Sequence, residues 1–233
     1  MQKVGDSMLF YVDGKKERYN PYNMKKDKKI GEGQEVDAYV VGDQVVKFYK
    51  PYCKKIRLSL NAVERLKKIS TSRILLPTVS MLDKKRNLRG YKMDYIENLG
   101  EESFLLLPKE KRKEELKKLK EDVLNLSDNG VILDDLHQLN TVYNNGIYFI
   151  DPGSYKFVKD DTLTENDKIQ CYGINIDRIN EFLISSLSHF SLVKHTNMTN
   201  SYLKSGKDNM IDYLFDREEN TLKDYVDNMS KKR

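Results

Sequence analysis

The sequence has little cysteine, little proline and no tryptophan, and these shortages narrow the class of protein. Its two cysteines, Cys53 and Cys171, lie far apart and form no CxxC motif. They predict two ordinary thiols in a reducing compartment rather than a disulfide or a zinc site. With five prolines in 233 residues, 39% hydrophobic and 33% charged, the chain is not expected to be disordered.

A long apolar run is also missing, since no stretch approaches the roughly 18 to 20 residues that cross a bilayer. The start, MQKVGDSMLFYVDGKK, lacks the basic and then apolar segments of a signal peptide. We therefore expect no membrane partner and a cytoplasmic location, or delivery into a host cell if the protein is an effector. Abundant Lys, Asn, Ile and Tyr suggest an AT-rich, bacterial genome.

Charge of one sign is not dominant, because 41 basic residues face 36 acidic ones and the net charge is +5. Most basic residues have acidic neighbours, so the sequence does not call for a nucleic-acid partner. The Lys- and Glu-rich stretch 108–126 predicts a helix with a solvated face, and an RNA-binding face is a minor alternative.

The first part of the chain predicts strands with one helix. Asp13-Gly14 favours a hairpin over residues 8–19. Further strands are expected around Gly31, over 38–41 and 44–49, and over 74–82 and 88–96, with one helix over 58–69 capped by Ser59. A polar break at 97–100 divides the chain into predicted domains 1–97 and 98–233.

The second part predicts mainly helices, so the expected class is α+β. Apolar spacing indicates helices over 108–126, 173–190, 201–215 and 221–229, with a polar loop at 160–167 and a frayed tail, SKKR.

Chemistry-bearing residues of the first part are two glycines, a lysine and a glutamate. Gly31 and Gly33 let a backbone approach a ligand, although a lone GxG is also an ordinary hairpin turn. Lys47 lies in an apolar strand, where a lysine needs a partner or an open face. Glu64 is either that partner or half of a surface pair with Lys67 or Lys68.

The stretch from Val131 to Gly153 concentrates the remaining polar groups. Asp135, His137 and Asn140 precede an expected hairpin with a tight turn at 143–146 and a strand at 147–150. Asp151 ends that strand. Carboxylate and amide oxygens are the ligands that Mg²⁺ prefers, so this stretch predicts a metal-nucleotide site.

This order of motifs resembles the protein kinase-like fold over about residues 28–190. The resemblance implies a bilobal protein with an antiparallel β N-lobe, one helix, and a small, mainly helical C-lobe. It implies ATP and Mg²⁺ as cofactors. Implied roles are phosphate cover for Gly31 and Gly33, phosphate binding for Lys47 paired with Glu64, a gatekeeper at Met93, an adenine-contacting hinge from Asp94 to Ile96, a catalytic base at Asp135, and metal ligands at Asn140 and Asp151.

The catalytic loop departs from ordinary protein kinases. Asp134 competes with Asp135, and the five-residue step to Asn140 selects Asp135. Asp-Leu-His-x-x-Asn, with His137 near the transferring phosphate, looks like the loop of aminoglycoside and choline phosphotransferases and of atypical kinases. Leu133, Asp134 and Pro152 replace the usual His-Arg and the Phe of Asp-Phe-Gly.

These residues lead to three hypotheses. The first is an atypical kinase that phosphorylates a hydroxyl on a protein Ser/Thr or on a small molecule. The second is a nucleotide-binding pseudokinase that acts as an interaction or regulatory module. The third and weakest is an RNA-associated kinase. The acceptor and the oligomeric state are not identified by the sequence.

Overall fold

The computed structural model of this chain describes residues 8–12, 15–19, 29–33, 35–50, 58–158 and 162–189. The chain divides into two compact units, which are described separately. The first unit consists of Met1–Ile69 and Leu75–Tyr95, and the second of Ser70–Ile74 and Ile96–Arg233. The predicted domains, 1–97 and 98–233, did not anticipate that Ser70–Ile74 belongs with the second unit.

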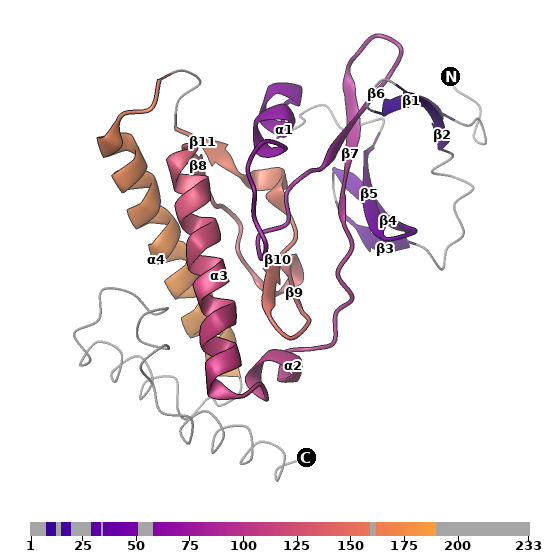
Figure 1. Cartoon of the computed structure of the whole chain (residues 1–233). Helices are drawn as coiled ribbons and strands as arrows, with labels where there is room; N and C mark the ends of the chain where they lie inside the picture. Colours follow the sequence, from indigo (N-terminus) through magenta and orange to yellow (C-terminus); the bar gives the residue numbers. More distant parts are fainter. Residues whose placement is uncertain are drawn as a thin grey trace. The chain divides into compact units, whose positions relative to one another are not determined.

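The described residues of the first unit contain one antiparallel sheet of seven strands, in the order β2-β1-β6-β7-β5-β4-β3 (Figure 1). The strands are β1 (Met8–Val12), β2 (Lys15–Tyr19), β3 (Lys29–Glu32), β4 (Val36–Val41), β5 (Gln44–Tyr49), β6 (Val79–Leu82) and β7 (Leu88–Asp94). The strands predicted over the first 49 residues are confirmed, while the turn Asp13-Gly14 lies outside the described residues.

The two faces of this sheet carry different side chains, because successive residues of a strand point to opposite sides. Val46 and Phe48 of β5 pack on one face into an apolar core. The other members of this core are Phe10, Val12, Tyr39 and Met81. Lys47 projects from the opposite face, where the register places it across from Tyr91 of β7. Strand β5 is therefore buried on both faces.

Helix α1 (Leu60–Leu66) packs against β6, where its Glu64 contacts Ser80 on the sheet face that carries Lys47. Ser59 caps it by accepting the N–H of Ala62 at 3.2 Å, as the sequence predicted. Ala62, Val63 and Leu66 form its buried side. The helix is shorter than the predicted 58–69.

The predicted strand over 74–82 is only partly correct, since β6 begins at Val79. Pro77 has no N–H and cannot donate to a ladder, which agrees with the late start. The predicted strand over 88–96 ends at Asp94.

In the second unit, two long helices lie side by side (Figure 1). The described elements are α2 (Glu102–Leu105), α3 (Lys109–Asp128), β8 (Val131–Ile132), β9 (Thr141–Tyr143), β10 (Ile147–Phe149), β11 (Lys156–Phe157) and α4 (Glu165–His189). The predicted stripe Leu116, Leu119, Val123 and Leu126 is the buried side of α3. Strands β9 and β10 form the predicted hairpin, and β8 pairs with β11.

Helix α4 begins at Glu165, so the prediction of a polar loop through Asp167 and a helix from 173 is wrong at this end. Thr164 Oγ1 accepts the N–H of Asp167 at 3.2 Å, and the Asp167 carboxylate accepts the N–H of Thr164 at 3.0 Å. This reciprocal capping box starts the helix within a polar sequence. The helices predicted over 201–215 and 221–229 lie outside the described residues. None of the described helices has the length and apolar character needed to cross a membrane.

Candidate functional site

The loop from Leu133 to Asn140 is held at its start by helix α4. The side chain of Asn175 on α4 is fully buried. Its Oδ1 accepts the N–H of Leu133 at 2.8 Å, and its Nδ2 donates to the carbonyl of Val131 at 2.8 Å and to Ser127 Oγ at 3.0 Å. One amide thus ties α3, β8 and the loop together. No local sequence pattern marks Asn175 for this role.

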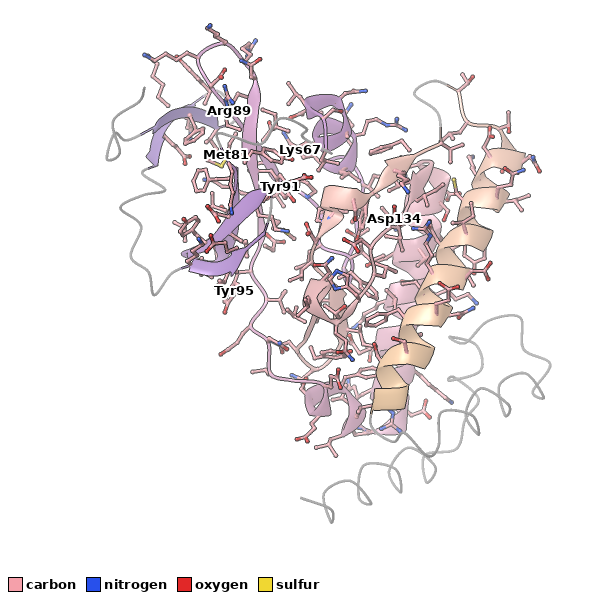
Figure 2. All side chains as sticks on the ribbon, turned by 180° about the vertical axis from the view of Figure 1, so that it is seen from behind. Lys67, Met81, Arg89, Tyr91, Tyr95 and Asp134 are labelled. Atoms are coloured by element: carbon pink, nitrogen blue, oxygen red, sulfur yellow. The ribbon has the colours of Figure 1, made fainter. Side chains whose placement is uncertain are left out.

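Asp134 and Asp135 are neighbours with different surroundings. Asp134, labelled in Figure 2, lies in the second unit. It forms ion pairs with Arg178 of α4 and with Lys156, the latter at 2.5 Å. Partial burial acts to raise the pKa of Asp134, but the hydrogen bonds from Lys156 and Arg178 outweigh it and lower the pKa. The carboxylate of Asp134 therefore anchors the loop.

Asp135 has a backbone conformation that residues other than glycine rarely adopt. Its φ is 60°, in the left-handed region, which Asp and Asn tolerate better than most residues. The side chain of Asp135 is 50% exposed. The backbone carbonyl of Asp135 accepts a hydrogen bond from Nδ2 of Asn140 at 3.0 Å. The Asp135–Asn140 spacing noted in the sequence corresponds to a closed, hydrogen-bonded turn with an exposed carboxylate.

His137 lies between these two residues. Its Nε2 is 3.5 Å from Oδ1 of Asp135 and 3.0 Å from Nδ2 of Asn140, and its Nδ1 accepts the N–H of Leu139 at 3.2 Å. The ring of His137 therefore lies against both the exposed carboxylate of Asp135 and the amide of Asn140. The neighbouring Leu139 is 88% exposed and offers an apolar surface beside the polar groups.

The β9–β10 hairpin brings Asn140 and Asp151 to the same end. Thr141 pairs with Phe149. The next pair toward the open end of the hairpin is Asn140 and Ile150, where the Ile150 N–H donates to the Asn140 carbonyl at 3.0 Å. Asp151 follows directly, and its Oδ1 accepts the N–H of Gly153 at 3.3 Å. The structure therefore places the two predicted metal ligands together at the open end of one hairpin.

Tyr155, which is not among the predicted site residues, is a polar residue near Asp151. Its side chain is buried, and its hydroxyl has no hydrogen-bond partner among the described residues. Burial, together with the negative charge of Asp151, raises the pKa of Tyr155, so the hydroxyl remains a donor at neutral pH. No sequence signal distinguishes it from the fourteen other tyrosines of the chain.

The predicted ion pair between Lys47 and Glu64 is not formed in the first unit. The Glu64 carboxylate accepts Ser80 Oγ at 2.7 Å and Lys67 Nζ at 3.1 Å. The alternative of a surface pair with Lys67 is thus the one the structure shows. Although partial burial acts to raise it, these two contacts lower the pKa of Glu64.

Lys47 is buried, and its ammonium lies 5.8 Å from the centre of the Tyr91 ring. This distance suits a cation–π contact. Strand β7 approaches closely here, because a Cβ on Gly90 would come within 2.1 Å of the Lys47 carbonyl oxygen. Only glycine fits at position 90 without moving the strand that carries Lys47.

The other predicted nucleotide-binding residues lie at three places. Gly31 on β3 pairs with Ala38, and Gly33 closes the turn by donating its N–H to the Val36 carbonyl at 2.8 Å. Met93 is buried on β7, and Asp94 at the end of that strand is exposed. Ile96 belongs to the second unit.

Two groups of predicted site residues result. Asp135, His137, Asn140 and Asp151 share one region of the second unit, while Gly31, Gly33, Lys47, Met93 and Asp94 belong to the sheet of the first.

The described residues contain no cluster of three or more His, Cys, Asp or Glu suited to a metal. A Mg²⁺ bound by one or two protein oxygens and by substrate phosphates would not need such a cluster. In comparisons with known proteins, no family model and no curated sequence matches the chain.

Proposed function

We propose that the chain is an ATP- and Mg²⁺-dependent phosphotransferase of the protein kinase-like type. It would transfer the γ-phosphate to a hydroxyl on a protein Ser/Thr or on a small molecule. The order of the observed elements agrees with the resemblance: a glycine turn between β3 and β4, Lys47 on β5, a helix, two strands, a long helix, the polar loop, the hairpin and Asp151.

The observation that carries this proposal is the hairpin end of the second unit. The hydrogen bond from the Ile150 N–H to the Asn140 carbonyl places Asn140 beside Ile150, the residue that precedes Asp151. Nδ2 of Asn140 donates a hydrogen bond to the backbone carbonyl of Asp135, whereas Oδ1 of Asn140 has no hydrogen-bond donor among the described residues. The amide oxygen of Asn140 and the carboxylate of Asp151, at nearby positions of this hairpin end, form a donor set that fits Mg²⁺.

Each residue of the loop then has a distinct task. Bound Mg-ATP would supply the phosphoryl group, and its Mg²⁺ would neutralise negative charge on the phosphates. Asp151 and Asn140 would hold the metal through oxygen atoms. The exposed Asp135 carboxylate would accept a hydrogen bond from the acceptor hydroxyl and receive its proton, and the ring of His137, 3.5 Å away, would position that carboxylate. For Lys47, on the sheet of the first unit, the resemblance implies binding of a phosphate.

A nucleotide-binding pseudokinase is the second candidate, and one observation favours it. Glu64 is engaged by Ser80 and Lys67 rather than by Lys47. A protein that binds nucleotide without transferring phosphate would tolerate this arrangement, whereas phosphoryl transfer needs every phosphate-binding group in position.

Thermal unfolding with Mg-ATP tests the nucleotide site. We expect the melting temperature to rise with Mg-ATP, because a ligand that binds the folded state stabilises it by mass action. Asp151→Asn should lose most of the rise, while Asp177→Asn, an exposed carboxylate on α4, should keep it. A wild-type protein that shows no rise at any Mg-ATP concentration contradicts the proposal.

Incubation with labelled ATP, a host lysate and a metabolite pool separates the two candidates. A kinase transfers label to an acceptor, and Asp135→Asn lowers the transfer about 10²- to 10⁴-fold while ATP still raises the melting temperature. Binding without transfer in the wild-type protein would favour the pseudokinase.

A further inference from the structure

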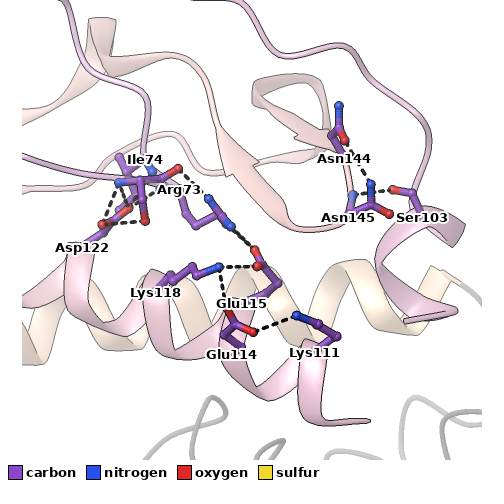
Figure 3. Close-up of polar contacts among 11 residues, drawn as sticks. Arg73, Ile74, Ser103, Lys111, Glu114, Glu115, Lys118, Asp122, Asn144 and Asn145 are labelled. Carbon is purple, nitrogen blue, oxygen red and sulfur yellow. Dashed lines mark hydrogen bonds and ion pairs between the residues drawn. The ribbon is translucent and has the colours of Figure 1, made fainter. Parts of the chain in front are cut away.

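A buried carboxylate on α3 captures a segment that precedes it by some fifty residues. Asp122 is 3% exposed. Its carboxylate accepts three successive backbone N–H groups, from Ser72 at 2.9 Å, Arg73 at 2.5 Å and Ile74 at 3.0 Å (Figure 3). Burial raises the pKa of Asp122 despite these three donors. The contacts make Ser70–Ile74 part of the second unit.

The side chain of Arg73 holds the same segment through a second set of contacts. Its guanidinium forms an ion pair with Glu115 of α3 (Figure 3) and lies 4.7 Å from the centre of the Tyr148 ring on β10. The hairpin turn fits closely over this pair. A Cβ on Gly146 would come within 2.6 Å of Glu115 Oε2 and 3.0 Å of Arg73 Nε.

The segment that Asp122 holds, residues 72–74, pairs with the outer edge of strand β10 of the hairpin. Ile74 forms a parallel bridge with Phe149, and the N–H of Phe149 donates to the Arg73 carbonyl at 2.9 Å. Both side chains are fully buried. The next N–H along the chain, from Ile150, donates to Asn140 on the other side. Strand β10 is thus held from both edges immediately before Asp151.

We propose that Asp122 is a positioning residue for the metal-binding end of this hairpin. By fixing the backbone of residues 72–74 against Phe149, Asp122 sets where Asp151 lies relative to Asn140. The inference rests on the proposed function, because it assigns Asp151 and Asn140 to Mg²⁺. Residues that orient metal ligands from a distance typically change metal affinity about 10- to 100-fold when replaced.

The test compares Asp122→Asn, which keeps one acceptor oxygen, with Asp122→Ala, which keeps none. Asp128→Asn is the matched control, because Asp128 is an exposed carboxylate on the same helix. The readouts are the Mg²⁺ concentration for half of the ATP-dependent rise in melting temperature, and amide hydrogen exchange at Phe149 and Ile150.

We expect Asp122→Asn to raise the half-saturating Mg²⁺ concentration about 10-fold or more and to speed exchange at Phe149, with Asp128→Asn unchanged. Asp122→Ala should have the larger effect if it folds, and Arg73→Ala, which leaves the backbone donors in place, the smaller one. A folded Asp122→Asn with unchanged Mg²⁺ dependence overturns the positioning role. A wild-type protein without any Mg-ATP response overturns the proposed function, and this inference with it.

Discussion

Two carboxylates of the second unit have opposite surroundings. Asp122 is buried and receives hydrogen bonds from three backbone N–H groups and from Ser72 Oγ, so the protein itself occupies its acceptor positions. Asp135 is half exposed, with His137 as its neighbour. The first carboxylate serves the fold, whereas the second remains available to a ligand.

The same contrast separates the adjacent residues Asp134 and Asp135. Asp134 is held by Arg178 and Lys156, while Asp135 projects from a left-handed turn. A backbone conformation that is unfavourable for most residues persists only when its surroundings enforce it, and such positions are frequent at active sites. The anchoring of Asp134 therefore supports the exposure of Asp135.

The largest expected effect is on turnover. Asp135→Asn should lower the transfer rate about 10²- to 10⁴-fold, because the amide cannot receive the acceptor proton. Its melting temperature should stay close to that of the wild type, since Asn also tolerates a left-handed backbone. Steady-state transfer of labelled phosphate and thermal unfolding measure the two quantities. Equal turnover in the variant would show that the base is another residue.

A smaller effect is expected at Asp134, and it depends on pH. Its pKa in the folded protein is below the ordinary 3.8. Its contribution to the free energy of unfolding is therefore complete above about pH 4 and is lost as the pH falls through the folded-state pKa. Asp134→Asn should lower stability at pH 7 by roughly 1 kcal/mol, because the ion pairs are partly exposed to solvent.

Urea unfolding of both proteins between pH 2 and pH 7 checks this expectation. The difference between them should shrink toward low pH. A difference that is constant across this range would mean that the charge of Asp134 is not what stabilises the loop.

The smallest effect is expected in the first unit, at Glu64. A double-mutant cycle on stability should give a coupling of about 0.3–0.5 kcal/mol between Glu64 and Lys67, as for a helical surface pair, and none between Glu64 and Lys47. Glu64→Gln and Lys67→Met, singly and together, provide the first cycle, and Lys47→Met the second. A larger coupling to Lys47 would indicate that Glu64 leaves Ser80 in solution.

Local patterns of the sequence predicted most of the described elements. The Asp135–Asn140 spacing, the 143–146 turn, the Ser59 cap and the apolar stripe of α3 each depend on residues within a few positions of one another. Predictions failed where the outcome depends on distant partners. Glu64 was assigned to Lys47, but Ser80 of β6 and Lys67 bind it, because the way α1 lies on the sheet decides which groups its side chains meet.

The sequence by itself determined the turn from Asp135 to Asn140, the hairpin and the carboxylate that follows it, because hydrogen bonds between residues close in the chain form them. Only the tertiary structure decided which carboxylates are buried and hydrogen-bonded within the protein, as Asp122 is, and which remain exposed, as Asp135 does. Asp122 and Ser72–Ile74 are far apart in the chain, and no local pattern marks three backbone N–H groups that converge on one side chain. Their contact follows from the packing of α3 against the captured segment, which in turn supports the strand that ends at Asp151.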